Sequence, residues 1–127
     1  MLAGKEIVGT IAVKDLAVAR KFYEGTLGLE VEDDKGTEAH SYRSGSTRLI
    51  VYRSQFAGTN KATALNFIVG ADIDKLVKGL RERGVAFEHY DMPGINWEGD
   101  VMVAGPMKAA WFKDPDGNIL CMMNGAG

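Results

Sequence analysis

The sequence predicts an α+β fold of two tandem βαβββ repeats whose strands form a curved, eight-stranded mixed sheet. The chain has 127 residues, 46% apolar and 25% charged, as expected for one globular domain. Its 16 glycines against three prolines indicate many tight turns between short elements. The same order of strand and helix patterns occurs twice. We therefore expect a single domain over residues 1–127, with repeats at about 5–55 and 62–125.

The first repeat opens with alternating β-branched residues in 7–13, which predict a strand. Asp15 then provides the N-cap of a helix with apolar residues at three- and four-residue steps, and Gly28 suits its C-terminal cap. Short runs bounded by turn residues predict three further strands, at 29–33, 40–43 and 47–53.

The second repeat follows the same order. A strand is predicted at 64–69, and Asp72 precedes a helical stripe that closes at Gly84. Further strands are predicted at 86–90, around 108–113 and at 119–123. The residues DPDGN at 114–118 suit a type I turn before the last strand.

Only the second repeat carries an insertion, at about 91–107. It holds the large apolar side chains Trp97, Met102 and Met107. Long loops of this kind are more often pocket walls or lids than plain connectors. We expect Trp97 to wall a cleft; the alternative is that it plugs an edge of the core.

Charge and cysteine content exclude several classes of protein. The net charge is −2 with no basic stripe, so nucleic acid is not an expected partner. The single cysteine, Cys121, excludes an intrachain disulfide and a zinc site of paired cysteines. No apolar run approaches a membrane span and the first residues do not form a signal peptide, so we expect a cytoplasmic protein.

Several motifs resemble those of the glyoxalase, bleomycin-resistance and extradiol-dioxygenase superfamily, also called vicinal oxygen chelate. They are VKDL at 13–16, FYE at 22–24, LGLEV at 27–31 and AWFKDPDGNIL at 110–120. The resemblance covers nearly the whole chain. It implies a doubled βαβββ fold, and it leaves the chemistry open because the superfamily includes isomerases, dioxygenases, thiol transferases and non-catalytic drug binders.

The enzymes of this superfamily hold a divalent metal with histidines and glutamates from four strands. Carrying those positions over places Val8, Ile50, Ala64 and Cys121 in the four ligand slots. The first three have no lone pair to offer, and one thiol cannot hold a catalytic divalent ion. The resemblance therefore predicts that the inherited metal site is missing and that no cofactor is bound.

Further polar residues are predicted on the face opposite the helices. Thr10 and Asn66 occupy equivalent places in the two repeats, and Arg48 and Tyr52 fall on the same face. His40 and His89 lie outside the ligand slots, and we expect them to be exposed or structural. Cys121 is expected to be a small buried hydrophobe rather than a reactive thiol.

These observations predict a metal-free, homodimeric protein that binds a flat or aromatic small molecule by stacking in an apolar cleft. The alternative is a lyase, isomerase or dioxygenase-type enzyme acting on a small carbonyl or aromatic substrate through a non-standard divalent-metal site. The residues expected to contact the ligand are Val8, Thr10, Ile50, Tyr52, Ala64, Asn66, Trp97, Met107, Trp111 and Cys121.

Overall fold

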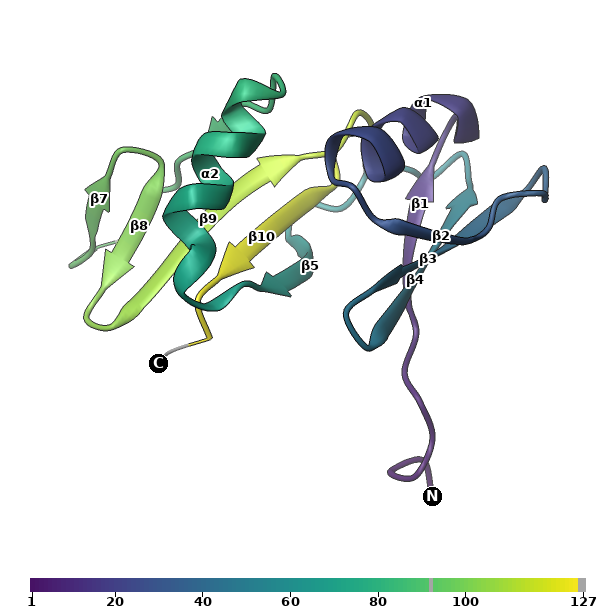
Figure 1. Ribbon diagram of the computed structural model, residues 1–127, viewed down its shortest axis with the longest axis horizontal. Coiled ribbons are helices and arrows are strands. Elements are labelled where there is room, and N and C mark those ends of the chain that lie inside the picture. Colours follow the sequence, from purple (N-terminus) through teal and green to yellow (C-terminus); the bar gives the residue numbers. More distant parts are fainter. Residues whose placement is uncertain (92, 126–127) are drawn as a thin grey trace. The chain divides into compact units, whose positions relative to one another are not determined.

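A computed structural model describes residues 1–91 and 93–125 of the chain (Figure 1). The chain divides into two units, Met1–Gly58 (unit 1) and Thr59–Gly127 (unit 2). Each unit has its own helix and its own mixed sheet. The α+β class is confirmed, whereas the assignment of residues 1–127 to a single domain stays a prediction.

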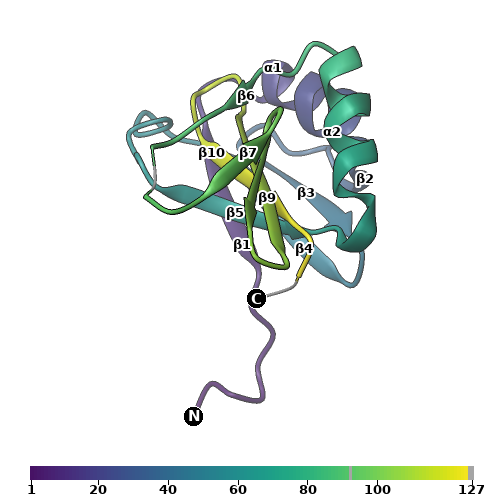
Figure 2. The ribbon, with the colours of Figure 1, turned by 90° about the vertical axis from the view of Figure 1, so that its left-hand side faces the viewer.

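Unit 1 contains the predicted strand, helix and three further strands. In chain order these are β1 (Gly9–Val13), α1 (Leu16–Arg20), the π-helical turn η1 (Lys21–Thr26), β2 (Glu30–Asp33), β3 (Ala39–Ser44) and β4 (Thr47–Arg53). The sheet order is β1-β4-β3-β2. β1 runs parallel to β4 and the other neighbours are antiparallel. The residues before β1 run away from this sheet (Figure 2).

The helix of unit 1 begins and ends where the sequence predicts. Asp15 Oδ1 accepts hydrogen bonds from the backbone N–H groups two and three residues on, at 2.8 and 3.2 Å. Gly28 adopts a φ of 71°, which favours glycine. The predicted single α-helix changes to a π-helical turn, because the N–H of Leu27 bonds to the carbonyl of Phe22, five residues back, at 2.8 Å.

One face of the unit 1 sheet is buried, and alternation along the strands sets the phase. The inward side chains of three strands are Ile11, Val13, His40, Tyr42, Leu49 and Val51. Tyr42 donates a hydrogen bond to Glu24 Oε2 at 2.9 Å, and burial followed by this bond holds the pKa of Tyr42 well above its usual value. The predicted inward phase of Ile11 and Val13 is confirmed, so Thr10 and Ala12 face the other way.

Unit 2 repeats this plan with additional strands. Its elements are β5 (Thr63–Ile68), the short helix η2 (Gly70–Asp72), α2 (Ile73–Glu82), β6 (Phe87–Glu88), β7 (Asn96–Glu98), β8 (Val101–Ala104), β9 (Met107–Lys113) and β10 (Ile119–Met123). The sheet order is β5-β10-β9-β8-β7, and β6 also pairs with β9. Helix α2 lies along one side of this sheet (Figures 1 and 2). Asp72 stands at its N-cap position without a capping side-chain bond, since η2 precedes the helix.

The expectation of a long loop at 91–107 is wrong. Most of it is a hairpin of β7 and β8, with Trp97 paired to Met102 and Glu98 to Val101. Gly99 supplies the tight turn with a φ of 64°. Met92, within the predicted insertion, lies outside the described residues. The described residues form two sheets, of four and six strands, rather than the expected single sheet of eight, and the hairpin supplies the two additional strands of unit 2.

The turn at 114–118 forms as predicted. The N–H of Gly117 bonds to the carbonyl of Asp114 at 3.0 Å, as in a β-turn. Asp114 and Asn118 are both buried, and Asn118 Nδ2 donates to Asp114 Oδ2 at 2.8 Å. These buried polar groups satisfy one another and hold the connection between β9 and β10.

Among the described residues, no helix has both the length and the apolar character needed to cross a membrane.

Candidate functional site

The open face of the unit 1 sheet carries the first four predicted site residues. Thr10 on β1 is the register partner of Ile50 on β4, and Ala12 is the partner of Tyr52. Thr10 is exposed, Ile50 is half-buried and Tyr52 is 39% exposed. Val8 is half-buried and comes just before β1. This face is therefore uncovered within unit 1 and displays single apolar and polar side chains.

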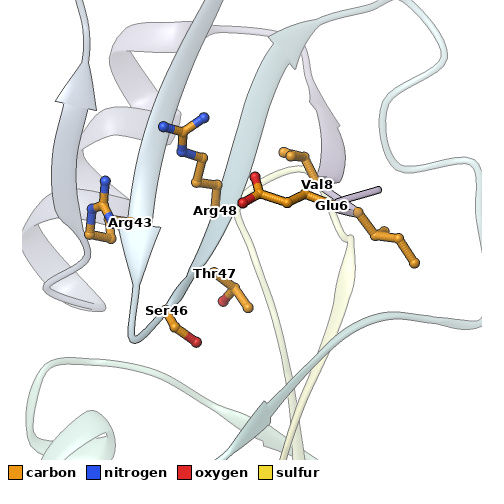
Figure 3. A pocket seen from close by; sticks show the side chains of 7 residues that line it. Glu6, Val8, Arg43, Ser46, Thr47 and Arg48 are labelled. Carbon is orange, nitrogen blue, oxygen red and sulfur yellow. The ribbon is translucent and has the colours of Figure 1, made fainter. Parts of the chain in front are cut away.

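A cavity of about 270 Å³ lies at one end of unit 1 (Figure 3). Its lining residues are Glu6, Ile7, Val8, Arg43, Ser46, Thr47 and Arg48. Glu32 on β2 pairs with Arg43 at 3.0 Å and with Arg48 at 3.1 Å. Two guanidinium groups thus share one carboxylate. Because the negative charge of Glu32 partly offsets the positive charge of Arg48, Arg48 attracts an anion less strongly.

The open face of the unit 2 sheet carries the equivalent positions. Cys121 on β10 is the register partner of Asn66 on β5 and of Trp111 on β9. Asn66 therefore occupies the place that Thr10 has in unit 1, as the sequence predicts. Ala64, two residues before it, and Asn66 itself are exposed.

Large apolar side chains fill part of this face. Met102, Ala109 and Cys121 form a buried cluster, and further apolar residues pack against it, namely Ile95, Trp97, Ala104, Met107, Trp111 and Met123. The indoles of Trp97 and Trp111 have centroids 6.3 Å apart and are tilted by 58°. Trp111 Nε1 donates to Thr63 Oγ1 at 3.3 Å. Two half-buried indoles thus stand over an apolar floor.

The structure therefore brings together four of the predicted residues, Trp97, Met107, Trp111 and Cys121. Cys121 is only 1% exposed and lies in this buried cluster with Met102. Burial raises the pKa of the Cys121 thiol to about 11, so it stays protonated and is a poor nucleophile near neutral pH. The expectation of a buried, unreactive thiol agrees with this environment.

Tyr90 packs edge-on against Trp111, with centroids 5.6 Å apart and an angle of 87°. Its hydroxyl is buried without a hydrogen-bond partner among the described residues. Burial, and then the charge of Glu88, raise the pKa of Tyr90. A buried unpaired hydroxyl costs roughly 1 to 3 kcal/mol, so this group is a candidate donor to a ligand atom.

A polar cluster beside Trp97 was not found from the sequence. His89 stacks on Trp97, with centroids 4.3 Å apart and planes within 6°. His89 Nε2 lies 2.8 Å from Asp100 Oδ1, and Arg81 on α2 donates to Asp100 Oδ2, from Nε at 3.1 Å and from its terminal nitrogen. These bonds lower the pKa of Asp100 and keep it ionised. The EGD turn at 98–100 was the only local signal, because spacing along the chain does not reveal these contacts.

The residues in the four inherited ligand slots do not fit a divalent metal. Val8, Ile50 and Ala64 offer no donor atom, and the Cys121 thiol is protonated and buried. Within residues 1–91 and 93–125, no three histidine, cysteine, aspartate or glutamate side chains gather in a metal-binding group. His89 and Asp100 are in contact, but they supply only two donors.

Solved structures share this fold at low sequence identity. A lactoylglutathione lyase from Agrobacterium tumefaciens has a TM-score of 0.72 and 17% identity, covering 96% of this chain and 94% of that one. A glyoxalase family protein from Enterococcus faecalis gives 0.71 and 22%, with coverage of 97% and 99%. The fosfomycin resistance protein FosX from Listeria monocytogenes gives 0.69 and 14%, with coverage of 100% and 94%.

A search of curated proteins finds no match. A family model described as the Glyoxalase/Bleomycin resistance protein/Dioxygenase superfamily matches residues 7–122. This span includes α1, α2 and all the strands, except for the last residue of β10. The chain belongs to the glyoxalase/bleomycin resistance protein/dioxygenase superfamily.

Proposed function

We propose that this protein binds a planar aromatic small molecule against the open face of unit 2, without a metal in the inherited ligand slots. The observation that carries this proposal is the pair of half-buried indoles, Trp97 and Trp111, standing over the closed floor of Met102, Ala109 and Cys121. We call Trp97, Met107 and Trp111 the tryptophan surface. Asn66, exposed beside it on the same sheet face, supplies a polar contact.

The energetics favour stacking as the mode of recognition. Trp97 and Trp111 are held by neighbours, since His89 stacks on one and Tyr90 and Thr63 contact the other. Held rings lose little side-chain entropy when a ligand binds. Each stacked pair contributes roughly 0.5 to 1.5 kcal/mol beyond the burial of apolar area. The polar cavity of unit 1 has no such rings, so it is the weaker candidate.

An enzyme that uses a non-standard metal site, as a lyase, isomerase or dioxygenase, is the alternative. It is supported by the names of two structural neighbours, a lactoylglutathione lyase and a fosfomycin resistance protein. Against it stands the finding that, within residues 1–91 and 93–125, no three histidine, cysteine, aspartate or glutamate side chains gather in a metal-binding group. We further propose that the protein acts as a homodimer in the cytoplasm, as the resemblance and the single free thiol suggest.

Fluorescence quenching tests the proposed function. Acridine and quinoline, as planar probes, should quench tryptophan emission saturably, whereas cyclohexanol, as a saturated control, should not. Equal behaviour of the planar and saturated probes would overturn the proposal.

Elemental analysis of the purified protein is the second test. A stoichiometric divalent metal, whose removal by a chelator abolishes binding, would favour the enzyme with a non-standard metal site. Light scattering should give about twice the 13.8 kDa chain mass.

A further inference from the structure

The cluster of Arg81, Asp100 and His89 holds one imidazole in a fixed orientation. Asp100 lies in the turn between β7 and β8, and its two oxygens are engaged separately: Oδ2 by Arg81 from α2, and Oδ1 by His89 Nε2 at 2.8 Å. Trp97 fixes the plane of the same ring by stacking at 4.3 Å and 6°. The ring is thus constrained both in its plane and along one edge.

This arrangement decides which nitrogen of His89 carries the proton. The bonds from His89 and Arg81 lower the pKa of Asp100, so it is a carboxylate and can only accept. Nε2 must therefore be the donor, and in the neutral ring Nδ1 keeps a free lone pair. Among the described residues, Nδ1 has no hydrogen-bond partner, and the side chain is 46% exposed. A carboxylate that orients an imidazole in this way is the arrangement that activates a histidine base.

We propose that His89 Nδ1 is a proton acceptor for a planar heteroaromatic or conjugated carbonyl compound with an acidic C–H, bound at the tryptophan surface. Asp100 and Arg81 are its positioning residues. The substrate's location rests on the proposed function, whereas the acceptor itself rests on the contacts of His89. The alternative is that Arg81, Asp100 and His89 only fasten the β7–β8 hairpin to α2 and have a structural role. Arg81 and Asp100 alone would suffice for that, and they leave the exposed, oriented Nδ1 unexplained.

A nitrobenzisoxazole is a suitable probe because it is planar and its elimination needs only a base. His89 Nδ1 takes the proton from the ring C–H carbon, and the electron pair of that bond completes the carbon–nitrogen triple bond of a nitrile. The N–O bond breaks, and its electron pair goes to the phenolate oxygen. The imidazolium then returns its proton to water. No oxidant, metal or second substrate is required.

The experiment uses the full chain and follows the coloured nitrophenolate product at about pH 8. His89→Gln should lower the protein-dependent kcat/KM by at least about 100-fold, the lower end of the range that general bases contribute. Asp100→Asn should lower kcat while leaving KM nearly unchanged. In this variant, nitrogen NMR of the imidazole should show that the Nε2–H tautomer is no longer preferred. Glu98→Gln, on the same hairpin but without a contact to His89, should leave the rate unchanged.

A second measurement covers the case in which His89→Gln does not fold. Diethyl pyrocarbonate acylates accessible imidazoles, and His40 is only 7% exposed, so of the two histidines the reagent should modify His89, and the wild-type protein should lose its activity. Unchanged rates in the modified protein or in His89→Gln would overturn the inference. If acridine still quenches while the elimination shows no protein dependence, the proton acceptor is wrong and the binding function stands. If neither occurs, the proposed function fails as well.

Discussion

In unit 1 the sheet ends at β2, which pairs with one edge of β3 and whose four residues are all exposed. In unit 2 the equivalent edge of β9 is shared by β6 and β8, and β7 extends the sheet further. The hairpin brings Trp97 and Asp100 into unit 2, and nothing in unit 1 corresponds to them. The same plan thus gives unit 1 a face with single apolar and polar side chains and unit 2 a face on which apolar and aromatic side chains are packed together. The difference lies in added edge strands rather than in the shared elements.

The largest expected effect comes from a charge placed at the same register position in the two units. Cys121→Asp puts a carboxylate into the floor of unit 2, whereas Ile50→Asp puts one on the half-exposed face of unit 1. The first variant should lower the free energy of unfolding by more than about 3 kcal/mol and the second by about 1 kcal/mol. Urea denaturation measures both. Similar losses in the two variants would show that the faces do not differ in burial.

The next effect concerns ligand affinity. Trp97→Ala should weaken acridine binding by about twofold to tenfold, which corresponds to the loss of one stacked ring of roughly 0.5 to 1.5 kcal/mol. Tyr52→Ala, which removes an exposed ring from the open face of unit 1, is the matched control and should leave affinity unchanged. Fluorescence titration supplies the affinities. If Trp97→Ala instead costs about 3 to 5 kcal/mol of stability with unchanged affinity in the folded fraction, Trp97 is a core plug.

A third effect is the acid dependence of unit 2. The pKa of Asp100 is lowered in the folded protein, chiefly by the bond from His89 and then by that from Arg81. Its stabilisation is therefore complete above the ordinary aspartate pKa of about 3.9 and is lost as the pH falls through the lower folded value. Wild-type protein should exceed Asp100→Asn in urea midpoint near neutral pH, and the gap should close below about pH 4. A gap independent of pH would contradict this account.

The smallest effect is expected in unit 1. Glu32→Gln removes the carboxylate shared by Arg43 and Arg48, but both arginine side chains are about half exposed. Exposed ion pairs contribute roughly 0 to 1 kcal/mol, so the urea midpoint should barely change. Binding of acridine should not change either. A loss as large as that of Cys121→Asp would mean that the polar edge of unit 1 is as important to stability as the apolar floor of unit 2.

Local patterns in the sequence determined the helix ends of unit 1, the turn at 114–118 and the inward phase of β1. Asp15 caps its helix, Gly28 ends it, and the DPDGN turn closes as predicted, because each depends on backbone groups within a few residues. Alternation on β1 gives the inward phase of Ile11 and Val13, because successive strand side chains point to opposite faces. The family motifs and the absence of donor side chains from the four ligand slots were also legible in the sequence.

Only the tertiary structure decided what covers the second face. Arg81 lies 19 residues from Asp100, His89 lies 11 residues from it, and Trp111 lies 48 residues from Thr63. No periodicity links such positions, since sheet register and the hairpin turn bring them together. The 91–107 segment resembled a loop because its strands are short, with Gly94 just before β7 and Gly99 between β7 and β8. Strands this short are stabilised by pairing, β8 with β9 and β7 with β8, and the local sequence does not reveal these partners.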